Sequence, residues 1–313
     1  MQWIKSYLSN RQQAVIIRGV QSNPRALKIG VPQGSVLGPE LFKDYVAPLS
    51  ALIEQFGVMF HGYADDTQLA NTFKPGGEDE KRALNEMQSC IKAIKSWMAL
   101  NSLKINDDKT EFMIIGSKAN LKKVKTNHII VGTHKIAVSS SVRNIGAVFD
   151  SEMTMIPQVL KTAQTAWFHL REISKIRIHL TQKQTQSVIH AYVTSRIDQN
   201  NSLINGIPAE YLNILQKVQN AAAKIILGGK KYDHVTPLLK QLHWLPLPQR
   251  YRFKTLLIVY KTLQGDGPSY LHDLLKPLQL ERFTRSSLNN LLEVTRTRVE
   301  YGDRAFSVAG PRL

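Results

Sequence analysis

The sequence contains little cysteine, no long apolar run and no start that resembles a leader peptide. Its 313 residues include one cysteine, Cys90, so no disulfide forms within the chain and no cysteine-rich zinc module fits. The longest apolar runs, such as residues 256–259, are far shorter than the roughly 20 residues that a membrane-spanning helix needs. The opening MQWIKSYLSNRQQ has no apolar segment of the signal-peptide kind. These absences predict an intracellular protein without membrane contact, and they leave cytoplasm and nucleus open.

Acidic residues are also scarce, and none occurs before Glu40. Lys and Arg number 41 against 24 Asp and Glu, which gives a net charge of +17. Divided at residue 150, the first part carries +6 and the second part +11. A basic excess of this size is typical of proteins that bind a polyanion, most often nucleic acid. The alternative is a soluble protein whose charge serves no specific partner.

The hydrophobic pattern changes near residue 150. Before it, two amphipathic helices are expected over residues 39–56 and 78–101, together with short strands. These strands are predicted at residues 14–20, 26–31, 58–63, 67–70, 111–116, 128–132, 135–138 and 144–150. Beyond residue 156 nearly everything is helical, with apolar stripes over residues 158–176, 181–197, 210–227 and 249–263. The sequence therefore predicts an α+β part over 1–150, a helical region over 151–228 and a basic helical region over 229–313.

Two adjacent carboxylates, Asp65 and Asp66, fall in the stretch HGYADDTQLA between two strand-like runs. A solvated turn is the simple interpretation, because Asp is a favoured turn residue. The alternative is a divalent-metal site, because neighbouring like charges repel unless a cation neutralises them. A Tyr-x-Asp-Asp match is weak evidence by itself, and its position at a hairpin tip strengthens it.

Several ordered segments carry a resemblance to a known family. GVPQGSVLGPELF (residues 30–42) is followed by YADDTQL (63–69), LNSLKINDDKTEFMIIG (100–116) and VRNIGAVFDSEMT (142–154). Farther on stand SRIDQNNSLINGIP (195–208), LQKVQNAAAKII (215–226) and a segment beginning LHWLPLPQRYRF at residue 242. In this order they resemble the reverse transcriptases of non-LTR (LINE-like, jockey-type) retrotransposons, over almost the whole chain.

The resemblance implies a partial reverse-transcriptase palm followed by an all-helical, thumb-like and C-terminal region. It also implies RNA template, DNA primer and dNTP as partners and Mg²⁺ as cofactor, with two ions in a complete enzyme. Asp65 would be a metal ligand, and Asp66 the second acid beside it. Lys109 would be a proton donor near the departing pyrophosphate, although a solvated lysine in a turn is the simpler interpretation of that residue alone.

The remaining site residues implied by the resemblance surround the nascent base pair and the primer end. They are Pro32, Gln33 and Gly34 in the upstream loop, and Tyr63 and Ala64 in the hairpin turn. Gly34 would let the template or the nucleotide approach closely, because glycine has no Cβ atom.

The family's first catalytic aspartate has no counterpart here, because the ~30 residues before the Pro-Gln-Gly loop contain no acid. The chain resembles a family member truncated at both ends. Two metal ions about 4 Å apart need carboxylates from two strands, so weak Mg²⁺ binding and no polymerase activity are expected of this chain alone. An incomplete sheet also predicts self-association. The alternatives are a non-enzymatic RNA-binding remnant and a translated relic.

Overall fold

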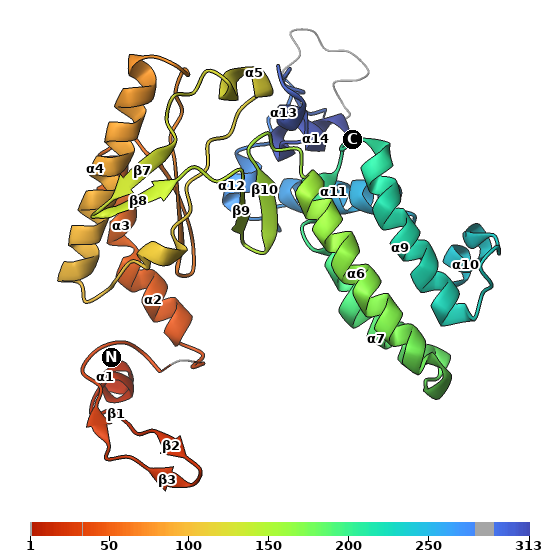
Figure 1. Ribbon diagram of the computed structural model, residues 1–313, viewed down its shortest axis with the longest axis horizontal. Coiled ribbons are helices and arrows are strands. Elements are labelled where there is room, and N and C mark those ends of the chain that lie inside the picture. Colours follow the sequence, from red (N-terminus) through yellow and green to blue (C-terminus); the bar gives the residue numbers. More distant parts are fainter. Residues whose placement is uncertain (1, 33, 279–290) are drawn as a thin grey trace. The chain divides into compact units, whose positions relative to one another are not determined.

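The computed structural model describes residues 2–32, 34–278 and 291–313, which Figure 1 traces in chain order. The backbone divides into two compact units. Unit 1 comprises residues 1–112 and 120–138, and unit 2 comprises residues 113–119 and 139–313. The secondary structure is mixed α+β, with small hairpins followed mostly by helices, as the sequence predicts.

Unit 1 combines short hairpins with one long helix. Its helices are α1 (Gln2–Leu8), α2 (Gly38–Val46), α3 (Pro48–Glu54) and α4 (Glu78–Leu100), followed by the 3₁₀ turn η1 (Asp107–Lys109). The short helix α5 (Lys118–Leu121) lies at the border between the units. The strands of unit 1 are β1 (Gln12–Gln13), β2 (Ile16–Ile17), β3 (Val20–Gln21), β4 (Arg25–Ala26), β5 (Met59–Tyr63), β6 (Asp66–Ala70), β7 (His128–Val131) and β8 (His134–Ala137).

The core of unit 1 forms where α3, β5 and α4 meet. Leu49, Ile53 and Val58 pack there with Cys90 and Ile94 of α4, and all five are buried. The helix α4 begins with three acids, which favour a helix N-terminus, and ends before Asn101 as its apolar stripe predicts. The helix also lies beside β7. Phe60 of β5 and Leu69 of β6 pack against the same cluster, which anchors the β5–β6 hairpin to the core.

Three expectations for unit 1 were wrong. The strand expected at residues 14–20 reduces to the two-residue strand β2 and the first residue of β3, and the strand expected at 26–31 keeps only Ala26, in β4; all of these residues are exposed. The helix expected over 39–56 divides at Ala47, because Pro48 has no N–H to donate to the preceding turn. The strand expected at 111–116 reduces to one isolated bridge between Phe112 and Val138.

Unit 2 contains one hairpin and a series of helices. The hairpin pairs β9 (Ser141–Asn144) with β10 (Ala147–Asp150). Its longer helical elements are α6 (Ile156–Ile176), α7 (Gln182–Ile189), the π-helical segment η3 (His190–Thr194), α9 (Ala209–Leu227), α10 (Val235–Gln241), α11 (Leu247–Leu263) and α14 (Phe306–Arg312). Its shorter ones are η2 (Arg177–His179), α8 (Ser195–Asp198), η4 (Asn201–Ile204), α12 (Ser269–His272) and α13 (Glu300–Asp303).

The core of unit 2 is larger and forms mainly between α6 and α9. Val159 and Ala166 of α6 and Leu215 and Val218 of α9 are fully buried in one cluster. The helix α9 ends at Gly228, whose φ of +71° is the left-handed conformation that glycine adopts without strain. The helix expected over 181–197 is interrupted by η3, which the apolar stripe alone does not reveal.

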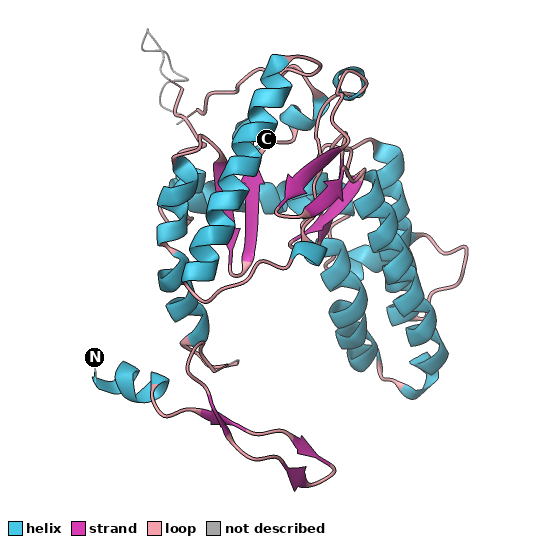
Figure 2. Cartoon of the chain, turned by 60° about the vertical axis from the view of Figure 1, so that its left-hand side comes forward, coloured by secondary structure: helices cyan, strands magenta, loops and turns pink. Residues whose placement is uncertain are grey.

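Every strand pair in the described part of the chain is a two-stranded antiparallel ribbon. Figure 2 draws the strands of these ribbons in magenta. No helix in the described part of the chain is long and apolar enough to cross a membrane.

Candidate functional site

The β5–β6 hairpin presents the two aspartates at its tip. Tyr63 pairs with Asp66 across the ribbon, so Ala64 and Asp65 form a two-residue turn. Ala64 has a φ of +53°, while Asp65 does not have a positive φ, a combination of signs found in type II′ turns. A left-handed conformation costs a non-glycine residue about 1 kcal/mol or more. The turn therefore holds local strain directly beside both carboxylates.

Asp65 and Asp66 are both exposed, and neither makes a side-chain hydrogen bond or ion pair with another described residue. Both carboxylates are therefore free to accept an external cation. Mg²⁺ commonly binds one or two protein carboxylates, with water and substrate phosphate oxygens completing its octahedral shell. Asp65 and Asp66 fit this donor set.

Among the residues that the structure describes, no site made of protein ligands alone is found for such an ion. Within residues 2–32, 34–278 and 291–313, no three His, Cys, Asp or Glu side chains gather closely enough to hold a metal ion. The hairpin thus offers two carboxylates, and the described residues add no third ligand to them.

The loop before α2 contains the residues expected beside the nascent base pair. Pro32 is exposed, and its carbonyl accepts a hydrogen bond from Ser35 Oγ at 2.7 Å. Ser35 Oγ in turn accepts the backbone N–H of Gly38 at 3.2 Å, which supports the start of α2. Gly34 has a φ of +80° and open space where a Cβ would lie. Gln33 lies outside the described residues.

Lys109 ends the 3₁₀ turn η1, and its side chain is exposed. Two residues earlier in the same turn, Asp107 is fixed by α4. Lys95 Nζ lies 2.7 Å from both carboxylate oxygens of Asp107, and only Oδ2 has hydrogen-bond geometry. This hydrogen bond is the main cause that lowers the pKa of Asp107 below its usual value. His134 Nε2 lies 3.8 Å from the same carboxylate.

The turn between β7 and β8 is shaped around the same lysine. A Cβ on Gly132 would lie 2.9 Å from Lys95 Nζ, and Gly132 has a φ of +64°. Lys95 therefore links α4, η1 and this hairpin. Sequence reasoning missed the link, because Lys95 lies on the polar side of its helix and no spacing rule pairs it with Asp107.

Of the expected site residues, the structure brings together Tyr63, Ala64, Asp65 and Asp66 in one hairpin turn. Among the described residues, no hydrogen bond or ion pair joins that turn to Pro32, Gly34 or Lys109. The assembly of these segments around one substrate remains a prediction.

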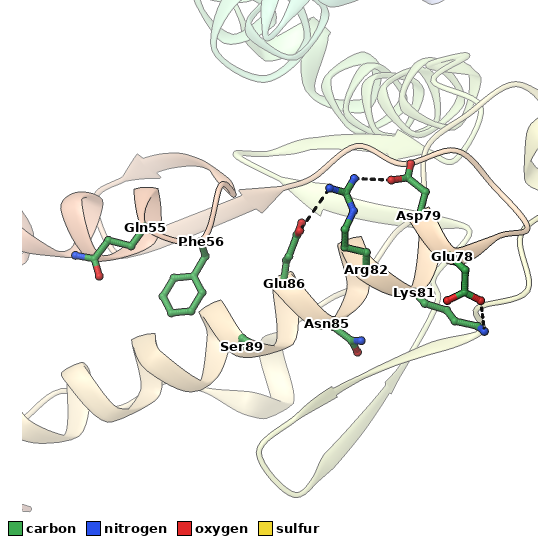
Figure 3. A pocket seen from close by; sticks show the side chains of 9 residues that line it. All are labelled: Gln55, Phe56, Glu78, Asp79, Lys81, Arg82, Asn85, Glu86 and Ser89. Atoms are coloured by element: carbon green, nitrogen blue, oxygen red, sulfur yellow. Dashed lines mark hydrogen bonds and ion pairs between the residues drawn. The ribbon is translucent and has the colours of Figure 1, made fainter.

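A separate hollow of about 950 Å³ lies beside the first turns of α4 (Figure 3). Its charged side chains are paired with one another. Lys81 Nζ lies 2.7 Å from Glu78, and Arg82 lies 2.5 Å from Asp79 and 3.9 Å from Glu86. None of the expected site residues lines this hollow, and its internal ion pairs leave no charged group aimed at a ligand.

Comparison with known proteins gives consistent matches. The family profile described as "Reverse transcriptase (RNA-dependent DNA polymerase)" matches residues 1–149. The probable RNA-directed DNA polymerase from transposon BS of Drosophila melanogaster is 26% identical over 253 residues, which cover 77% of this chain and 27% of that protein. The probable RNA-directed DNA polymerase from transposon X-element of the same organism is 24% identical over 251 residues, covering 76% and 26%.

A third relative in that organism, the RNA-directed DNA polymerase from mobile element jockey, is 23% identical over 167 residues. The match covers 51% of this chain and 17% of the relative. The chain thus spans about a quarter or less of the length of these curated relatives. No solved structure matches the chain.

Proposed function

We propose that the chain carries the carboxylate hairpin of an RNA-directed DNA polymerase. Residues 1–149 form a reverse transcriptase domain. The chain is also distantly homologous to RNA-directed DNA polymerases of non-LTR retrotransposons. The observation that carries the proposal is the tip of the β5–β6 hairpin. Two adjacent aspartates are exposed there, without partners among the described residues, on a turn anchored to the unit 1 core.

In this proposal Asp65 and Asp66 bind Mg²⁺ together with the triphosphate of an incoming dNTP. When bound, Mg²⁺ would neutralise the charge that develops during nucleotidyl transfer. Pro32, Gln33 and Gly34 would border the nascent base pair, and Tyr63 and Ala64 the primer end. Lys109 would donate a proton near the pyrophosphate, with RNA as template and DNA as primer.

In this proposal the donor set found among the described residues is incomplete, and this limits what the chain would do by itself. The hairpin would then bind Mg²⁺ weakly, and the bound ion would keep most of its water ligands. Polymerase activity would require a further carboxylate from another segment or another chain. We therefore expect no primer extension by this chain alone. Mg²⁺-dependent extension by the purified chain, abolished in Asp65→Asn, would show that the centre is complete after all.

Metal binding at the hairpin can be tested with Mn²⁺ as a paramagnetic substitute for Mg²⁺. In amide NMR spectra of the full chain, substoichiometric Mn²⁺ should broaden the signals of residues 62–68. Asp65→Asn and Asp66→Asn should each weaken this broadening. Asp108→Asn is the matched control, because Asp108 is also an exposed acid in an adjacent Asp pair, and it should leave the broadening unchanged. Equal broadening in the hairpin variants and the control would refute the proposal.

A second candidate function is non-enzymatic binding of RNA by the helical part of the chain. The net charge of +11 over residues 151–313 favours it. Binding through phosphate contacts weakens steeply with salt, because counterions are released on association. Steep salt dependence of RNA binding that Asp65→Asn leaves unchanged would support this function, and RNA binding without salt dependence would exclude it.

A further inference from the structure

The solvent-facing side of α6 carries large aromatic side chains. Trp167 is 39% exposed and Phe168 is 56% exposed. Leu160, Arg171 and Lys175 are exposed on the same side, since their spacings from the two rings are the three-, four- and seven-residue steps of one helix face. The opposite side of α6 is buried in the core of unit 2. The rings are therefore not required to fill that core.

Two further rings, His169 of α6 and Tyr192 of a neighbouring element, continue from Phe168. The Phe168 and His169 rings lie 5.4 Å apart, and the His169 and Tyr192 rings are also 5.4 Å apart. Tyr192 is 51% exposed and belongs to the π-helical segment η3. Such segments are rare and frequently occur at functional sites. Here the π-helix buries Val193 while Tyr192 remains exposed beside His169.

The charge on α6 is predominantly positive. The helix contains Lys161, Arg171 and Lys175, all exposed, and one acid, Glu172. Glu172 pairs with Lys175 at 2.8 Å. Lys161 and Arg171 are therefore not paired with an acid of their own helix. Lys161 precedes the two rings in the sequence, and Arg171 follows them.

We propose that this α6 face, defined by Lys161, Trp167, Phe168 and Arg171 of α6 together with Tyr192 of η3, binds single-stranded nucleic acid. Exposed rings stack on unpaired bases, and interleaved cations contact the phosphates. A duplex hides its base faces, and so would use the cations but not the rings. The inference rests on the proposed function for the choice of nucleic acid as polyanion, and it concerns a different unit from the aspartate hairpin.

The test is fluorescence anisotropy of labelled 12-nucleotide oligo(U) and oligo(dT), and of a 12-base-pair duplex, with the full chain at several salt concentrations. Trp167→Ala and Phe168→Ala should each weaken binding of the single strands on the order of ten-fold. Phe168→Leu should do the same, and because it keeps an apolar side chain it separates ring stacking from a loss of folding. Tyr232→Ala is the matched control, since Tyr232 is 87% exposed and lies beside Lys231 elsewhere in unit 2.

The charges have a separate signature. Lys161→Gln combined with Arg171→Gln should reduce the slope of log affinity against log salt by about 1.4, which corresponds to two single-strand phosphate contacts. The ring variants should leave that slope unchanged. Asp65→Asn should not alter single-strand binding, so a failed hairpin proposal and a failed α6 proposal give different results.

Three results would overturn the inference. One is equal binding by Phe168→Ala and the Tyr232→Ala control. Another is duplex binding as tight as single-strand binding. The third is a sedimentation change from dimer to monomer in Trp167→Ala with nucleic-acid binding unchanged, which would make a second copy of the chain the occupant of this face.

Discussion

Glu80 provides the sharpest test of how unit 1 is held together. It lies in the first turn of α4 and is only 3% exposed. Its Oε2 accepts the backbone N–H of Gly76 at 2.7 Å. Its Oε1 accepts the backbone N–H groups of Lys125 and Thr126 at 3.0 and 2.8 Å, and the Thr126 hydroxyl at 2.7 Å. One carboxylate therefore joins α4 to a segment 45 residues later in the chain.

Replacing Glu80 with Ala removes the acceptor of four donors. A buried donor left without a partner costs about 1–3 kcal/mol. Lys125 is exposed, so water can replace part of the loss, and we expect Glu80→Ala to lower the free energy of unfolding unit 1 by roughly 3 kcal/mol. Glu80→Gln should cost about 2 kcal/mol, because its NH₂ group would face an N–H donor where an oxygen now accepts.

The assay is amide hydrogen exchange of residues 74–80 and 124–128, read by mass spectrometry. A loss of about 3 kcal/mol corresponds to exchange that is roughly a hundred-fold faster. Glu78→Gln is the control, because Glu78 is an exposed acid in the same turn that pairs only with Lys81. Equal exchange rates in Glu80→Ala and Glu78→Gln would refute the argument.

The effect of Glu80 should depend on pH. Burial by itself would raise the pKa of Glu80, but the hydrogen bonds from Thr126, Gly76 and Lys125 outweigh burial and lower that pKa below its ordinary 4.5. A carboxylate whose pKa is lower in the folded state stabilises the fold above its unfolded pKa, and the contribution is lost as the pH falls through the folded value. The stability difference between wild type and Glu80→Gln should therefore narrow below about pH 4.5.

Three further predictions concern single positions. Ala64→Gly should stabilise the hairpin by up to about 1 kcal/mol, because glycine adopts a positive φ without strain; faster amide exchange of residues 62–67 would contradict this. Leu215→Ala should cost about 2–5 kcal/mol in urea unfolding of unit 2, whereas Leu263→Ala, at an exposed position, should stay within about 0.5 kcal/mol. Asp198→Asn should lower the free energy of unfolding by about 1–2 kcal/mol, because Arg250 Nε donates to Asp198 Oδ1 at 2.7 Å in a half-buried ion pair. An unchanged midpoint of urea unfolding would contradict this prediction.

The helices could be predicted well because their signals are local. The stripe of α9 and its stop at Gly228 are both visible in the sequence, and the structure confirms them. The interruption of the helix by η3 could not be predicted, since a π-helical turn changes the period without changing the residue types. Likewise the prediction of a strand at residues 111–116 was wrong, because a run of apolar residues does not reveal whether a partner strand lies beside it.

The candidate site shows the same division. The hairpin around Asp65 and Asp66 follows from two strand-like runs joined by turn residues, and the structure confirms that hairpin. The contact between Lys95 and Asp107 depends on where the end of α4 meets a distant turn, so no local pattern encodes it. The roles assigned to the hairpin, the Pro-Gln-Gly loop and Lys109 stay predictions that the proposed experiments address.

The solitary cysteine of the chain makes unit 1 separately observable. Cys90 is fully buried in the core between α3, β5 and α4, and burial raises the pKa of its thiol. Thiol reagents attack the thiolate, so they react with this side chain only when the surrounding core opens. Unit 2 contains no cysteine. The rate at which a thiol reagent labels the unmodified protein therefore reports the opening of unit 1, and unit 2 contributes no signal. The lifetime of the closed core that supports the aspartate hairpin can thus be timed without introducing any substitution.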